Sequence, residues 1–385
     1  MAYRPKDIYR GRRKYRVPLT IALSVLAALI VGAVALFYFL QQFLVYDQTG
    51  VRLQLPFMAA EETEETIEAT PTPAFIPVEV QIVYEDPDFS ELDLGGWEEL
   101  KPTTAKFVPY ADAASEQRLN AALALVSTDD YNGVVLELKD RGGQLAWASA
   151  CEMAVSYGTA GTMDYTETVA ALHERGLAVG ARISCLADEL LATRNWPLAL
   201  RDLGGTTYRD GRGVYWLDPY NRQVRDYIAD LMAELAAMGF DEILLADLYH
   251  PISDNALFDD SGALVDTGFT YSVTVQTGPN PVNAVCQMGK RLVEGMEGTG
   301  VAVSAVIDES SLLEGRAERT GQDIGVFWRI FARLYCPCES WNAPTDLEYA
   351  AETLNAGEAS VRFVPVCEYF PEGFESVLIL PTVNQ

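Results

Sequence analysis

The amino-acid sequence predicts an α/β protein dominated by a TIM-like (β/α)8 barrel, preceded by one transmembrane helix and an acidic linker. Eight short runs rich in β-branched residues recur after residue 103, and most follow a segment with helical periodicity. Repeated helix, glycine and strand units are typical of parallel βα architecture, and eight strands favour a closed barrel over an open doubly wound sheet. The runs are 105–110, 133–138, 177–184, 242–248, 301–307, 333–336, 361–366 and 377–381.

The first expected element is a membrane-spanning helix over 17–44. Residues 1–16 carry seven basic side chains and one acid, and no charged side chain follows between Arg16 and Asp47. This apolar run fits one bilayer crossing, which needs about 20 residues, and exceeds the roughly 7–15 residues of a signal-peptide core. We therefore expect a signal-anchor with residues 1–16 in the cytoplasm, Leu19–Leu40 in the cell membrane and the C-terminal domain outside; a cleaved secretory signal is the alternative.

The next expected segment is an extracytoplasmic linker over 45–103. Its stretch 61–77 is acidic, rich in threonine and interrupted by prolines, so it cannot bury a core and is typical of an extended spacer. The barrel domain is then expected over 104–385. Its clearest helix is predicted between Pro219 and Met238, with Gly239 as the stop. A long irregular insertion, with a hairpin near 257–265, is expected between Pro251 and Pro281.

Charge and cysteine usage exclude several classes of function. Beyond Arg16 the chain has 21 basic and 54 acidic residues, so the exterior part would repel nucleic acid, whose binding requires basic patches. Six cysteines show no paired spacing typical of zinc sites, and we expect buried thiols and no metal. Neither a dinucleotide-binding glycine motif nor a phosphate-binding loop follows the first strand, so no cofactor is expected.

Ionisable residues recur at the C-terminal ends of the predicted strands, where the active sites of barrels lie. Glu137 and Lys139 are two residues apart, so they are expected on one face of their strand. The most probable chemistry is that of two carboxylates, as in glycoside hydrolysis. The candidate catalytic residues are Asp247, Glu137 and Asp308, and the candidate substrate-binding residues are Lys139, Arg182, Asp188, Trp216, Tyr249, His250 and Glu368.

Four segments resemble a bacterial family of proposed glycoside hydrolases, first described as a domain of unknown function. They are "YNGVVLELKDRGGQLAWAS", "LHERGLAVGARISCLAD", "YWLDPYNRQVRDYIADLMAELAAMGFDEILL" and "GQDIGVFWRIFARLYCP". The resemblance covers roughly 104–385 and implies a TIM-like barrel distantly similar to the α-amylase group. This sequence departs from the family pattern at polar positions: Glu137 replaces an aspartate, Ala246 stands at a later aspartate, and Asp247 stands where the family has tyrosine.

Two interpretations follow from these residues and from the resemblance. The first is a membrane-anchored hydrolase of a cell-envelope or extracellular polysaccharide; the second is an inactive barrel that binds carbohydrate or serves as an envelope scaffold, with protein partners unknown. We expect Glu137, Lys139 and Arg182 to form one ion-paired set near the mouth of the barrel, which is its opening at the C-terminal ends of the strands. Asp247 is expected to reach the mouth through a one-residue bulge and to act with Glu137 or Asp308; the alternative is that Ala246 faces inward and Asp247 points to the helix layer in a structural role.

Overall fold

The computed structural model describes two compact units, 1–78 and 79–385, which are taken separately. The described residues are 44–47, 50–53, 100–262, 264–272, 280–308, 311–312, 315, 319–337, 359–371 and 373–381. In the first unit, β1 (Leu44–Asp47) and β2 (Gly50–Leu53) form an antiparallel hairpin. The predicted membrane span Leu19–Leu40 lies outside the described residues. Within the described ranges, no helix is both long and apolar enough to cross a bilayer.

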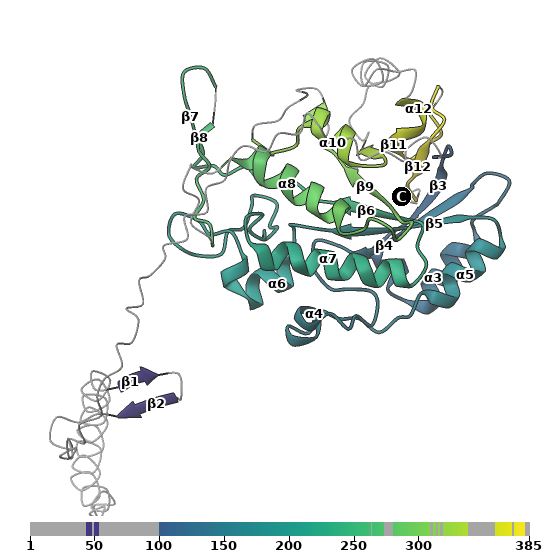
Figure 1. Ribbon diagram of the computed structural model, residues 1–385. Coiled ribbons are helices and arrows are strands. Elements are labelled where there is room, and N and C mark those ends of the chain that lie inside the picture. Colours follow the sequence, from purple (N-terminus) through teal and green to yellow (C-terminus); the bar gives the residue numbers. More distant parts are fainter. Residues whose placement is uncertain are drawn as a thin grey trace, which may run out of the picture. The chain divides into compact units, whose positions relative to one another are not determined.

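The second unit contains a closed barrel of parallel strands in the order β3-β4-β5-β6-β9-β10-β11-β12 (Figure 1). This closure confirms the predicted (β/α)8 fold, and every predicted run overlaps one of its strands. The register between neighbours is regular except for a shift between Glu137 and Lys139 where β4 meets β5. The strands are β3 (Thr104–Val108), β4 (Gly133–Lys139), β5 (Ala178–Ser184), β6 (Glu242–Ala246), β9 (Ala302–Val306), β10 (Leu334–Pro337), β11 (Phe363–Cys367) and β12 (Val377–Ile379).

The helices cover the outside of the barrel, and α7 (Arg222–Ala237) is the longest of those described. It begins three residues after Pro219, because the Asn221 side chain caps its first turn, and it ends before Gly239, whose φ is +92°. The other described helices are α2 (Tyr110–Ala113), α3 (Glu116–Ala124), α4 (Glu152–Ser156), α5 (Thr166–Glu174), α6 (Glu189–Arg194), η2 (Trp196–Leu198), α8 (Pro281–Glu294), α10 (Ile324–Ile330) and α12 (Ala359–Arg362).

Two apolar clusters hold the barrel together. The larger lies between the strands and the helices, and the smaller fills the barrel interior with Ala105, Val135, Leu244, Tyr335, Val364, Val366 and Leu378. A polar network joins Glu242 to Arg333 at 2.9 Å and to the Tyr335 hydroxyl at 3.1 Å. Glu242 begins β6, so this network closes the N-terminal end of the barrel and leaves ligand access to the C-terminal end.

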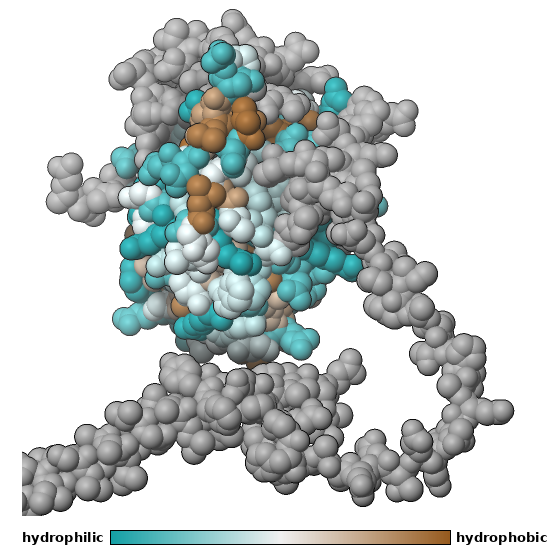
Figure 2. Space-filling view, turned by 90° about the vertical axis from the view of Figure 1, so that its left-hand side faces the viewer, coloured by the Kyte–Doolittle hydropathy of each residue, from teal (hydrophilic) through white to brown (hydrophobic). Residues whose placement is uncertain are grey.

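The predicted insertion lies at the C-terminal end of the barrel, because it follows β6. Its expected hairpin is confirmed as β7 (Leu257–Phe258) and β8 (Leu264–Asp266). The Tyr208 hydroxyl donates to the Ile252 carbonyl at 3.1 Å, which ties the insertion to the loop between β5 and α7. Figure 2 faces the side of the molecule that carries this insertion and shows separate apolar patches among polar residues.

The cysteines behave as buried apolar residues rather than as metal ligands. The five that the structure describes are all buried, and no disulfide joins any two of them; Cys338 lies outside the described residues. Burial raises the pKa of the Cys185 thiol to about 12, so this sulfur is protonated at neutral pH. Among described residues, no group of three His, Cys, Asp or Glu side chains could hold a metal ion.

Candidate active site at the C-terminal end of the barrel

The first ion pair of the mouth joins neighbouring strands. Glu137 of β4 stands in register with Arg182 of β5, and their side chains form a salt bridge while both stay partly accessible. The second Glu137 oxygen accepts the backbone N–H of Tyr110 at 3.0 Å. Arg182 also lies 5.8 Å from the Phe107 ring centre.

Lys139 does not belong to that set, which corrects the prediction. The register shift between Glu137 and Lys139 interrupts the alternation of β4, so the two side chains point to different partners. Lys139 is fully buried, with its Nζ 2.9 Å from Asp188 and 2.7 Å from the Ser184 carbonyl oxygen. Asp188 also caps α6 by accepting the N–H of Leu191 at 2.7 Å. This buried pair is structural and has no access to a substrate.

Asp247 forms a third ion pair, just beyond the end of β6. One carboxylate oxygen accepts Nε and Nη2 of Arg141, at 3.0 and 2.7 Å, and the other accepts the Ser184 hydroxyl at 2.8 Å. Burial favours the neutral acid, but the bond and charge of Arg141, with the charge of Arg182, lower the pKa of Asp247 overall. Asp247 is therefore a carboxylate at neutral pH.

The backbone, rather than a bulge, turns Asp247 away from the regular strand direction. Its φ of +51° is the one left-handed value among the described residues other than glycine, and β6 pairs with β5 regularly up to Ala246. Such a conformation costs on the order of 1–3 kcal/mol and persists where the surroundings enforce it. Contacts to Arg141 and Ser184 supply that enforcement. Strain of this kind is concentrated at functional sites, so Asp247 is the strongest candidate residue.

The predicted aromatic residues and His250 build the wall beside Asp247. Trp216 is fully buried, and its ring centre lies 5.0 Å from that of Tyr249. His250 is buried with one ring nitrogen 2.8 Å from the Pro251 carbonyl oxygen and the other 2.9 Å from the Tyr271 hydroxyl. Burial lowers the pKa of His250 to about 4. With both nitrogens occupied, His250 shapes the wall and is not available for proton transfer.

A cavity of about 260 Å³ opens beside this wall. Tyr249 and His250 line it together with Asp308, which follows β9, and with Arg212 from the loop between β5 and α7. Arg212 donates to the Tyr249 hydroxyl at 3.2 Å. Asp308 is exposed, and its strand is the neighbour of β6, which carries Asp247. Glu368 is also exposed at the end of β11, three strands from β6 and outside the lining of this cavity.

Sequence reasoning missed Arg141, Ser184, Asp210 and Arg212 as members of the site. Arg141 follows β4 directly, and the "KDRGG" turn was the available signal, because a strand that ends in a charged turn points to the mouth. Arg212 lies in a long loop, and nothing in its local sequence indicates which strand end it approaches.

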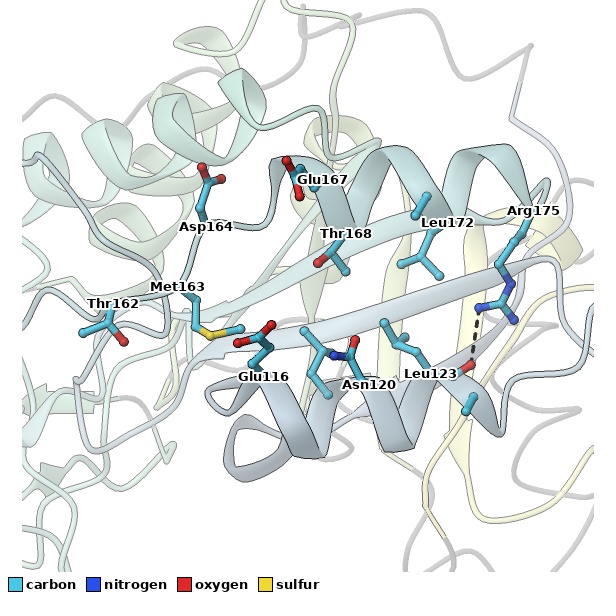
Figure 3. A pocket seen from close by; sticks show the side chains of 13 residues that line it. Glu116, Asn120, Leu123, Thr162, Met163, Asp164, Glu167, Thr168, Leu172 and Arg175 are labelled. Atoms are coloured by element: carbon cyan, nitrogen blue, oxygen red, sulfur yellow. Dashed lines mark hydrogen bonds between the residues drawn. The ribbon is translucent and has the colours of Figure 1, made fainter.

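A larger hollow of about 810 Å³ lies elsewhere, between α3 and α5 (Figure 3). Its acids Glu116, Asp164 and Glu167 gather at one end, and Arg175 at the other donates to the Leu123 carbonyl at 3.3 Å. This groove belongs to the helix layer and receives no side chain from a strand end. It is therefore not the candidate active site.

A closed barrel of eight parallel strands with helices on its outside defines a protein of the (β/α)8-barrel class. Residues 105–325 match the family described as "Putative glycosyl hydrolase domain", and the chain belongs to that family. The search of curated proteins found no match. The sequence resemblance to this family is thereby confirmed.

The chain is similar to several solved structures. The PgaB (BpsB) glycoside hydrolase domain from Bordetella bronchiseptica is similar at 12% identity and a TM-score of 0.50, over 73% of this chain and 94% of that one. A hypothetical protein from Ruminiclostridium thermocellum is similar at 21% identity and a TM-score of 0.43, over 52% of this chain and 95% of that one. Ega3 of Aspergillus fumigatus, solved with galactosamine, is similar at 11% identity and a TM-score of 0.40. The match covers 71% of this chain and 79% of that one.

Proposed function

We propose that this protein is a glycoside hydrolase that cleaves a cell-envelope or extracellular polysaccharide through a pair of carboxyl groups. The observation that carries the proposal is Asp247, a buried carboxylate in a strained conformation at the C-terminal end of β6. An ionised carboxylate can serve as the nucleophile or as the base that activates water. The separation of the two carboxyl groups distinguishes these two roles.

Asp308 is the proposed proton donor that completes the pair. It lies past the end of β9, adjacent to β6, whereas Glu137 lies on β4, two strands from β6. Neighbouring strands are about 4.8 Å apart, so carboxyl groups at their ends can reach the separations used by glycosidases. Asp308 is also exposed and lines the cavity, whereas Glu137 does not line it. Of the two partners considered, Asp308 is therefore the one that a substrate in this cavity can reach.

A non-catalytic glycan-binding barrel is the second candidate function. The observation in its favour is that two acids of the mouth, Glu137 and Asp247, each form a salt bridge with an arginine. A protein that only binds sugar would need no protonated acid at all, and these pairs would then serve to hold the wall in place.

The experiment that separates the two functions is incubation of the full-length protein, in detergent, with fractionated envelope and secreted polysaccharides. The chain length of each polysaccharide is followed by size-exclusion chromatography, and new reducing ends are counted. A hydrolase shortens at least one fraction and releases reducing ends. If the protein co-elutes with a polysaccharide fraction but never shortens its chains, it is a binding protein. The hydrolase proposal would then be wrong.

We also propose that the barrel works outside the cell membrane, anchored by one N-terminal helix. The support is the basic segment 1–16, the uncharged stretch to Asp47 and the acidic spacer that follows. A polysaccharide of the envelope is then the nearest available substrate. The barrel itself has no need of the anchor for its fold, since its strands and core lie within 104–380.

A further inference from the structure

Two exposed arginine side chains lie near each other at the rim of the mouth. The side chain of Arg141, after β4, is 43% exposed, and that of Arg212 is 63% exposed. The hydrogen bond to the Tyr249 hydroxyl raises the pKa of Arg212 overall, whereas the nearby charge of Arg141 lowers it. Arg141 is paired with Asp247 at 2.7 Å and Arg212 with Asp210 at 3.5 Å, so these carboxylates offset part of the repulsion between the two arginines.

Both guanidinium groups keep hydrogen-bond donors for a ligand. Arg141 uses Nε and Nη2 on a single oxygen of Asp247, and its Nη1 contacts no acceptor among the described residues. Arg212 uses Nη2 for Tyr249 at 3.2 Å and lies only loosely against Asp210 at 3.5 Å. Planar guanidinium groups are the side chains best suited to bind a carboxylate or phosphate through parallel N–H bonds.

The nearest acid, Asp210, is held mainly within its own turn. Its two oxygens accept the backbone N–H groups of Arg212 and Val214, at 2.9 and 2.8 Å, and the indole N–H of Trp216 at 3.3 Å. Partial burial raises the pKa of Asp210, but these bonds lower it overall. Arg212 meets Asp210 only through Nη2 at 3.5 Å, so its Nε and Nη1, which contact no acceptor among the described residues, can donate to a ligand.

We propose that Arg141 and Arg212 bind an anionic group, a carboxylate or a phosphate, carried by the glycan that enters the mouth. The identity of the ligand as a glycan rests on the proposed function. Arg141 follows β4 and Arg212 lies in the loop after β5, and Arg212 lines the cavity beside Tyr249 together with Asp308. Because the rest of the chain is strongly acidic, a polyanion is attracted by this local pair and not by the molecule as a whole.

The test compares polygalacturonate with its fully methyl-esterified form, which has the same backbone without the charge. Binding to the full-length protein in detergent is measured by calorimetry, and inorganic phosphate is added as a competitor. We expect the charged polymer to bind at least about tenfold more tightly than the ester. Displacement by phosphate at millimolar concentration would identify a site for phosphate as well, and its failure would assign the site to carboxylate.

Arg212→Gln should remove most of that preference, because it deletes the charge from an exposed position with little effect on folding. Arg118→Gln is the matched control: Arg118 on α3 is 59% exposed and is also paired with an aspartate, Asp112, but lies in the helix layer. The control should keep the full preference. Equal binding of both polymers, an unchanged preference in Arg212→Gln, or an equal loss in Arg118→Gln would each overturn the inference.

These outcomes are independent of turnover. Preferential binding of the charged polymer without cleavage of any polysaccharide would contradict the hydrolase proposal and support the anion site. Cleavage of neutral polysaccharides alone, unaffected by Arg212→Gln, would support the hydrolase and reject the anion site.

Discussion

Individual residues of the mouth are fixed by partners that come from other strands. Asp247 is held by Arg141 of the β4 loop and by Ser184 of β5, so its position depends on three consecutive strands of the barrel. Its apolar neighbours were predictable, because a run such as 242–248 is typical of a strand buried on both faces. Its partners were not, since Arg141 is 106 positions away in the sequence and meets Asp247 only when the barrel closes.

Removal of the Glu137 charge should destabilise the protein by about 1–3 kcal/mol, because it leaves Arg182 partly buried without its partner. Chemical unfolding of Glu137→Gln measures this cost. Asp112→Asn, which breaks the exposed pair with Arg118, is the comparison and should cost less than about 1 kcal/mol. If Glu137→Gln unfolds at the wild-type denaturant concentration, the Glu137–Arg182 pair does not stabilise the mouth.

His250 should make the stability of the barrel depend on pH. Its folded pKa of about 4 lies below the ordinary 6.5, so between these values the unfolded chain binds a proton that the folded chain does not. The free energy of unfolding is then unaffected above about pH 6.5 and falls by up to about 3 kcal/mol as the pH approaches 4.

Unfolding curves at half-unit pH steps check this dependence. His250→Gln should flatten the curve between pH 6.5 and 4 while it lowers stability at pH 7. His173→Gln on α5 retains His250 and should therefore keep the slope. A slope that survives in His250→Gln would have to be assigned to other groups.

At the scale of elements, the loop after β4 and the start of α6 form one unit around a buried ion pair. Lys139 and Asp188 pair at its centre, and the N–H groups of Glu189 and Leu190 donate to the carbonyls of Arg141 and Gly142. This unit fixes the backbone that carries Arg141 to Asp247. The sequence predicted β4 correctly but placed Lys139 with Glu137, because strict alternation along a strand cannot foresee a register shift.

Substitution of Gly143 by alanine tests directly whether this unit depends on the buried ion pair. A Cβ at Gly143 would lie 2.0 Å from an Asp188 oxygen, whereas a Cβ at Gly176 would meet nothing within 4 Å; both residues have left-handed φ, +86° and +78°. Gly176→Ala should cost about 1–2 kcal/mol from backbone strain alone. Gly143→Ala should cost about 3 kcal/mol more, since it also displaces Asp188 from Lys139. Equal losses in thermal and denaturant unfolding would show that the Lys139–Asp188 pair does not hold the loop.

At the scale of the whole molecule, barrel closure was predictable from the sequence and the shape of the mouth was not. Most of the eight strands carry β-branched residues, and β10 (Leu334–Pro337), which has none, is still a short apolar run, so the number of strands follows from local pattern. The mouth depends on loops such as 199–217 and 251–272, whose contacts, including Tyr208 with Ile252, are made between segments without periodicity. Local signals therefore give the scaffold, and long-range polar contacts give the site.

The membrane arrangement predicts a protease pattern. Protease added to intact spheroplasts should remove the chain beyond about residue 60, because the acidic spacer and barrel are expected outside. A tag before residue 16 should stay protected until detergent is added. A barrel that resists protease in intact spheroplasts but is digested after lysis would contradict the proposed topology.

The central claim is that Asp247 is the carboxylate that performs chemistry at the mouth. The most direct test uses Asp247→Asn and the polysaccharide that the wild-type protein cleaves fastest. The rate at which reducing ends are released is measured and corrected for the folded fraction, which circular dichroism gives. The comparison is Asp226→Asn, which removes an exposed charge on α7. We expect Asp247→Asn to lose at least about a thousandfold in turnover while it still binds the polysaccharide, and Asp226→Asn to match the wild type. Turnover by folded Asp247→Asn within a few-fold of the wild type would contradict the claim.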